Sequence, residues 1–109
     1  MGIPQYNLYM AGGGIKTATV AGTAIALAGT TACCSVIITT ISTVTGIIAI
    51  GNSTCYASGG ALGSGVNAGS TPFMYYAKDL GNVYVSCSVS ATTEAVRYIY
   101  YLEIGRAHV

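Results

Sequence analysis

Four cysteines are the side chains in this sequence that are best suited to hold a metal or act as nucleophiles: Cys33, Cys34, Cys55 and Cys87. No two of them have Cys-x-x-Cys spacing, and no histidine or carboxylate lies near enough in sequence to complete a zinc motif. The adjacent pair cannot easily bridge each other, although either thiol could meet one of the other two in space. We expect free thiols that pack as small apolar side chains, with no metal and no cofactor.

Groups that could act as acids or bases are scarce. Every residue from Thr17 to Ala77 is uncharged, and Asp79, which follows Lys78, is expected to cap a turn. The one histidine, His108, lies in a C-terminal segment that we exclude below, so serines, cysteines and carboxylates lack a base to form a nucleophilic set. We therefore predict no catalytic residues and no enzymatic activity.

Three consecutive glycines, Gly12 to Gly14, precede Ile15-Lys16-Thr17 and superficially resemble a phosphate-binding loop. The full spacing Gly-x4-Gly-Lys-Ser/Thr is absent, so we expect a hinge between an N-terminal arm, residues 1–14, and a domain at residues 15–103. An apolar arm needs another surface to cover it. The alternative is that this segment is the first strand of the domain. The apolar residues of the arm are Ile3, Tyr6, Leu8, Tyr9 and Met10.

Residues 104–109 read Ile-Gly-Arg-Ala-His-Val, which is the translation of a common short-read sequencing adapter. We expect this segment to be a scar without organised contacts and exclude it from fold reasoning. The remaining cations, Lys16, Lys78 and Arg97, balance the acids Asp79, Glu94 and Glu103. A neutral chain lacks the clustered cations that nucleic acid requires, so no nucleic-acid partner is expected. It also lacks the charge that keeps small domains apart, so we expect a homo-oligomer.

The apolar residues recur with a period of two, which is typical of strands. The pattern is clearest from Val83 to Val89, where three valines and Cys87 alternate with tyrosine and serine. Further strands are expected at 15–20, 23–28, 34–39, 47–50, 72–76 and 96–102, and the glycine-rich segment from Ser58 to Thr71 is expected to be a loop. About seven short strands predict an all-β fold, an antiparallel β-sandwich or a jelly-roll-like barrel.

A transmembrane helix between Ala32 and Gly51 is the main structural alternative, because this window is uncharged and apolar. Most of its large residues are valine, isoleucine and threonine, which are branched at Cβ and suit a pleated sheet better than a helix. No Lys or Arg flanks the window to set an orientation. We therefore favour strands here and do not expect contact with a membrane.

Nine tyrosines give the chain an unusual supply of side chains that are apolar in body and polar at the tip. Such residues suit interfaces with proteins or sugars, although about half of them should belong to the core or to strand faces. We predict an interface that combines tyrosines of the domain with residues of the arm. Its members are Ile3, Tyr6, Leu8, Tyr9, Tyr75, Tyr76 and Tyr101.

Four short segments follow one another between residues 45 and 99: Thr45-Gly46-Ile47-Ile48-Ala49-Ile50-Gly51, Ala68-Gly69-Ser70, Asp79-Leu80-Gly81-Asn82-Val83-Tyr84-Val85 and Glu94-Ala95-Val96-Arg97-Tyr98-Ile99. Their succession resembles small structural proteins of tailed-bacteriophage virions, of the head-decoration, head-fibre or tail-associated type. The longer Ser/Gly-rich loop and the adjacent cysteines depart from that pattern. The resemblance implies a β-sandwich that is located in the virion and decorates or extends a phage particle. It also implies self-association, as a trimer by analogy, and contact with a capsid or tail protein.

Two other functions fit the same pattern. The first is a secreted or cell-surface adhesin-like β-subunit, in which strand edges pair between copies and tyrosines contact carbohydrate. The second is a small membrane protein with one helix near residues 32–51. Solubility without detergent separates the membrane protein from the others, and affinity for phage capsids separates the virion component from the adhesin.

Overall fold

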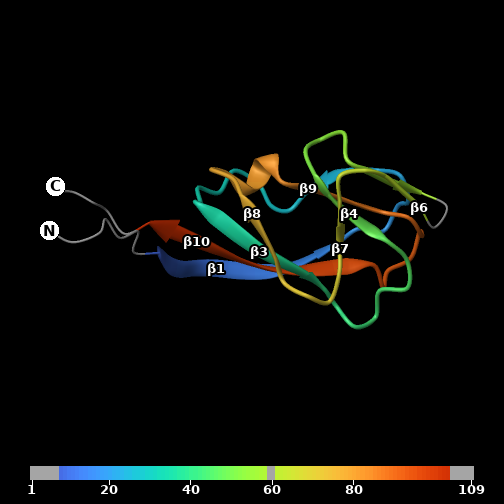
Figure 1. The fold of residues 1–109 in the computed structure, drawn as a ribbon, viewed down its shortest axis with the longest axis horizontal. Helices are drawn as coiled ribbons and strands as arrows, with labels where there is room; N and C mark the ends of the chain where they lie inside the picture. The colour runs from blue at the N-terminus through green and yellow to red at the C-terminus, as the bar shows by residue number, and fades with distance from the viewer. Residues whose placement is uncertain (1–7, 59–60, 104–109) are drawn as a thin grey trace, which may run out of the picture.

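A computed structural model describes residues 8–58 and 61–103, which form ten strands and one short 3-10 turn (Figure 1). The elements are β1 (Leu8–Thr17), β2 (Ile25–Ala26), β3 (Ser35–Thr40), β4 (Ile48–Gly51), β5 (Tyr56–Ser58), β6 (Ala61–Ser64), β7 (Val66–Ala68), β8 (Phe73–Tyr76), η1 (Leu80–Asn82), β9 (Tyr84–Cys87) and β10 (Ala95–Glu103). The predicted all-β class is confirmed, and the arrangement is that of an antiparallel β-sandwich.

Two four-stranded sheets build the sandwich. The long sheet has the strand order β1-β10-β3-β8, and the short sheet has the order β2-β9-β4-β7. In Figure 1, β1, β10 and β3 run beside one another along the length of the molecule. Successive residues of a strand point to opposite faces, so alternate apolar side chains of both sheets meet in one core. Fully buried residues of this core include Val36, Ile38, Ile48, Ile50 and Val85.

A hairpin of β5 and β6 covers the outer face of the short sheet. Ala57 of β5 is buried in a second small cluster with Ala49 and Cys55. The Ala57 N–H donates a hydrogen bond of 3.3 Å to the Ser86 hydroxyl on β9. Strand β4 is therefore buried on both faces, which explains why the sequence there is continuously apolar instead of alternating.

The three glycines expected to form a hinge lie inside β1, which pairs with β10 along its length. Gly12 lies opposite Tyr100, and Gly14 lies opposite Tyr98. A Cβ atom on Gly12 would come within 2.8 Å of the Tyr100 hydroxyl oxygen, and one on Gly14 within 3.0 Å of the Tyr98 hydroxyl oxygen. These glycines make room for tyrosine rings that lie across the strand. Residues 8–14 thus match the alternative expectation of a first strand, while residues 1–7 of the expected arm lie outside the described residues.

The glycine-rich segment expected to be a loop contains two strands, β6 and β7. Strand β7 adds to the edge of the short sheet by pairing Val66 with Ile50 and Ala68 with Ile48. Gly65 permits the turn before it, because its φ of +106° is a conformation that side-chain-bearing residues rarely adopt. The strands predicted at 34–39, 47–50, 72–76, 83–89 and 96–102 correspond to β3, β4, β8, β9 and β10, and the one at 23–28 is reduced to β2.

The window from Ala32 to Gly51 contains β3 and β4, so the alternative of a helix there is wrong. Ile48 and Ile50 of this window face the core between the sheets. Within residues 8–58 and 61–103, no helix has the length and apolar character needed to cross a bilayer.

Candidate functional site

Glu94 is completely buried, and both oxygens of its carboxylate accept hydrogen bonds from other residues of the protein. It accepts hydrogen bonds from the N–H groups of Thr45 (2.9 Å) and Gly46 (3.0 Å) and from the hydroxyls of Thr45 and Thr93 (3.1 Å each). Burial disfavours the charged form, but these bonds together outweigh it and lower the pKa of Glu94 below its usual value. The group fastens the turn before β4 to the start of β10, which is a structural role.

Asp79 also serves the local fold. Its Oδ1 accepts hydrogen bonds from the N–H of Thr31 (2.9 Å) and from the N–H of Gly81 (2.7 Å) at the start of η1. These two backbone bonds hold the pKa of Asp79 below its usual value. The predicted turn cap is confirmed, and this carboxylate also connects η1 to the loop before β3.

All four cysteines are free thiols, as the sequence predicted; Cys34 is half-buried and the other three are buried. Burial raises the pKa of Cys33, Cys55 and Cys87, so these thiols stay protonated at neutral pH. Cys87, for example, donates a hydrogen bond to the Ala18 carbonyl at 3.0 Å. In the part of the chain that the structure describes, no three His, Cys, Asp or Glu side chains gather closely enough to hold a metal ion.

The outer face of the long sheet is the main candidate for a functional surface. Residues paired across strands share a face, and those opposite to the core side form this outer face. Its members are Leu8, Met10 and Ile15 on β1, Arg97, Ile99, Tyr101 and Glu103 on β10, Ser35, Ile37 and Thr39 on β3, and Met74 and Tyr76 on β8. Tyr76 is 78% exposed, Met10 63% and Ile15 56%. An apolar patch of this kind usually marks an interaction site.

The charges on the outer face lie at its two ends. Arg97 is near the start of β10 and Glu103 is its last residue. Six positions separate them along the strand, so both point to the same face and lie about 20 Å apart at about 3.3 Å per residue. The surface between them is apolar, with Ile99 and Tyr101 on the same strand.

A pocket of about 300 Å³ lies at the Glu103 end of the outer face. Each strand of the long sheet contributes one residue to its lining, Leu8, Glu103, Ser35 and Tyr76, and Cys34 completes it. Ser35 is only 1% exposed, and its hydroxyl has no hydrogen-bond partner among the described residues. Buried polar side chains nearly always have a partner. The Ser35 hydroxyl is thus unpartnered among the described residues, but it is enclosed and solvent does not reach it.

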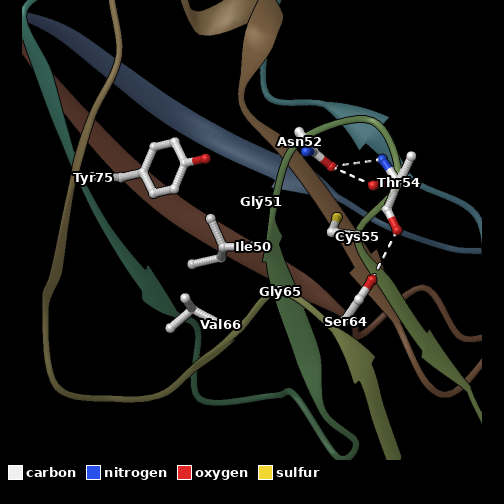
Figure 2. A pocket seen from close by; sticks show the side chains of 9 residues that line it. All are labelled: Ile50, Gly51, Asn52, Thr54, Cys55, Ser64, Gly65, Val66 and Tyr75. Carbon is white, nitrogen blue, oxygen red and sulfur yellow. Dashed lines mark hydrogen bonds between the residues drawn. The ribbon is translucent and has the colours of Figure 1, made fainter.

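A second hollow, of about 320 Å³, opens between the sheet edges near the end of β4. Figure 2 shows Tyr75 of β8 on one side and the loop around Asn52 and Thr54 on the other. The Asn52 side-chain oxygen accepts a hydrogen bond from the Thr54 N–H at 2.9 Å, and the Ser64 hydroxyl donates to the Thr54 carbonyl at 2.9 Å. These polar groups thus mainly hold the loop together.

The residues predicted for an interface are divided between several places. Leu8, Tyr76 and Tyr101 lie together on the outer face. Tyr9 is on the opposite face of β1 and is 45% exposed, and Tyr75 packs against the core and lines the hollow of Figure 2. The other two, Ile3 and Tyr6, lie outside the described residues.

Sequence reasoning missed most of the outer face, including Ile15, Ile37, Met74 and Ile99. Alternation along a strand distinguishes its two faces but does not say which face stays open. That depends on the hairpin of β5 and β6, which covers the short sheet, whereas no element within residues 8–58 and 61–103 covers the long sheet. The buried Ser35 gave no signal, because a serine that alternates with valine and isoleucine is ordinary in a strand.

Comparisons with protein-family models, with curated proteins and with solved structures find no match to this chain. The interpretation of the outer face and its pocket therefore depends on their own residues and geometry.

Proposed function

We propose that the protein is a structural subunit that self-associates and decorates or extends a phage particle through protein–protein contacts. The observation that supports an assembly role is the outer face of the long sheet, where large apolar side chains such as Met10, Ile15 and Tyr76 are exposed. The free energy falls when another protein surface covers a face of this kind, because apolar side chains are then removed from water. The balance of charges outside residues 104–109 leaves little repulsion between copies.

The location in a virion rests on the resemblance of the four sequence segments to small virion proteins. Three of them fall on strands of the short sheet or on β10, and the fourth includes the Asp79 cap. These segments maintain the sandwich, and the last of them also places Arg97 and Ile99 on the outer face. The resemblance thus supports the kind of scaffold, and the outer face supports the mode of assembly.

The test of the virion role is to read the DNA on both sides of the gene and to search purified virions for the protein by mass spectrometry. Neighbouring capsid or tail genes, together with peptides of this chain in the particles, would support the proposal. A gene surrounded by secretion or cell-envelope genes, with no peptides in virions, would contradict it.

A second candidate is an adhesin-like subunit that contacts carbohydrate. The hollow of Figure 2 favours it, because Tyr75 offers an aromatic ring on one side and Ser64, Thr54 and Asn52 offer hydroxyl and amide groups on the other. Binding of the full chain to neutral glycans on an array would favour this function over the first. The matched control is Tyr76→Ala, which removes an exposed tyrosine outside the hollow.

A further inference from the structure

We infer that two copies of this chain stack through their outer faces with the β10 strands antiparallel, so that Arg97 of each copy enters the pocket beside Glu103 of the other. This inference rests on the proposed self-association and specifies its geometry. The occupant of the outer face is a second copy, because the charges of Arg97 and Glu103 at its two ends make that face complementary to itself.

The direction of stacking follows from the two charged residues. A two-fold axis that lies in the plane between the faces and runs perpendicular to β10 brings Arg97 of one copy over Glu103 of the other, twice. A two-fold axis parallel to β10 would place Arg97 over Arg97 and Glu103 over Glu103. Opposite charges favour the first arrangement, and like charges disfavour the second.

The centre of such a pair would be apolar. The axis would pass near position 100 of β10, midway between Arg97 and Glu103, so Ile99 and Tyr101 of both copies would meet there. Ile37 on β3 and Met74 on β8 lie in the same cross-strand row as Ile99 and would pack around them. An apolar centre with charged groups toward the edge is the usual anatomy of a specific interface.

The pocket suits a guanidinium group in particular. Glu103 supplies a carboxylate, whose two oxygens can accept hydrogen bonds from more than one donor. Tyr76 supplies an exposed aromatic ring, over which a cation is attracted. Arg97, which is exposed, carries five N–H donors. An arginine from a second copy would therefore bring N–H donors to this carboxylate and a cation to the Tyr76 ring.

The test is sedimentation velocity on the full chain and its charge variants. We expect the wild type to sediment as a dimer, and Arg97→Glu or Glu103→Arg alone to weaken the dimer at least about tenfold, because each places like charges opposite one another. The double variant with both changes should restore the wild-type Kd to within about threefold. Lys78→Glu makes the same charge change as Arg97→Glu outside the strands of the long sheet, and it should leave the dimer unchanged.

Restoration by the double variant excludes misfolding as the reason for the single-variant losses, and circular dichroism checks the fold of each variant. A wild-type monomer at all concentrations overturns the stacked pair but leaves contact with a particle as the proposed function. A trimer overturns the pair and leaves self-association in place. If the double variant does not recover the wild-type Kd, the Arg97–Glu103 contact is overturned. A restored dimer in a chain that is absent from virions supports the pair and overturns the virion role.

Discussion

Gly12 and Gly14 of β1 lie under the rings of Tyr100 and Tyr98, where a Cβ atom would come within 2.8 Å and 3.0 Å of the two hydroxyl oxygens. We expect Gly12→Ala and Gly14→Ala each to lower the free energy of unfolding by about 1–3 kcal/mol, because the added methyl group would push a tyrosine ring away from the strand. Urea denaturation measures the change.

Gly29→Ala is the control, because a Cβ atom at that position meets nothing within 4 Å. Its effect should be near zero or slightly stabilising, since alanine reduces the freedom of the unfolded chain. If all three variants lost the same stability, the packing of tyrosines on β1 would not explain the glycines.

Glu94 makes stability depend on pH. Its pKa is lower in the folded chain than in the unfolded one, so the stability it contributes is complete at neutral pH and is lost as the pH falls through the folded pKa. We expect the free energy of unfolding of the wild type to fall from about pH 5 to about pH 3. Asp79, whose pKa is also lowered, contributes with the same sign.

Glu94→Gln should reduce stability at pH 7 by about 2 kcal/mol, because the amide places an N–H₂ donor where the carboxylate accepted bonds from Thr45 and Gly46. The variant should also lose less stability in acid than the wild type, although Asp79 keeps part of the slope. Chemical denaturation at a series of pH values gives both curves. Parallel curves would show that Glu94 is not the group that titrates.

At the scale of elements, the sequence predicted strands where side chains alternate and missed them where side chains are small. The prediction was clearest for β9, because Val83, Val85 and Cys87 alternate with polar residues in the sequence. All three are buried in the structure. Strands β6 and β7 looked like a loop, because glycine, serine and alanine are common in loops and the pairing of β7 with β4 is not visible in the sequence. Local composition predicted a loop there, whereas hydrogen bonds between β7 and β4 and between β6 and β5 decided the structure.

The same limit applied to the outer face. Tyr76 and Tyr101 were predicted as interface residues from their side-chain type, and both lie there. Tyr75, chosen for the same reason, instead points toward the core, because neighbouring residues of a strand face opposite ways. Residue type could suggest an interface, but only the register of β8 with β3 shows which tyrosine belongs to it.

The outer face can be tested as a unit with a matched pair of lysine substitutions. Ile15 lies on it and is 56% exposed, while Val20 is 57% exposed but lies between β1 and β2, outside the long sheet. We expect Ile15→Lys to weaken self-association by about tenfold or more, because a charge in an apolar interface must lose its hydration. Light scattering at several concentrations measures the mass.

Val20→Lys should leave the mass unchanged, since it adds the same charge at the same exposure elsewhere. Equal loss of mass in both variants would mean that net charge, and not the outer face, controls association. No change in either variant would exclude the Ile15 region from the contact.

At the scale of the whole molecule, the two sheets differ in what covers their outer faces. The hairpin of β5 and β6 covers the short sheet with its own small core, and among the described residues no element does the same for the long sheet. The asymmetry gives the molecule a closed side and an open side. Association through the open side would bury apolar surface without disturbing the sandwich.

Cys34 reports on whether the open side is covered in solution, because this half-buried thiol lines the pocket next to Ser35 and Glu103. We expect it to react with a thiol reagent faster than the three buried cysteines, and its labelling to slow as protein concentration rises and pairs form. Mass spectrometry of the labelled chain follows the rate. Cys34→Ser should remove the fast phase, and a rate independent of concentration would contradict coverage of the pocket.

The position of β10 also has a consequence for how the chain is made. This strand lies between β1 and β3 in the long sheet, yet it is the last strand of the described chain to be synthesised. Until it leaves the ribosome, β1 has no neighbour to pair with, and β3 lacks the partner on one side. Pairings between such distant segments form slowly and leave strand edges exposed meanwhile. The sandwich can therefore be completed only after β10 has been translated. A chain that ends before β10 would leave β1 without its partner strand and prone to aggregation.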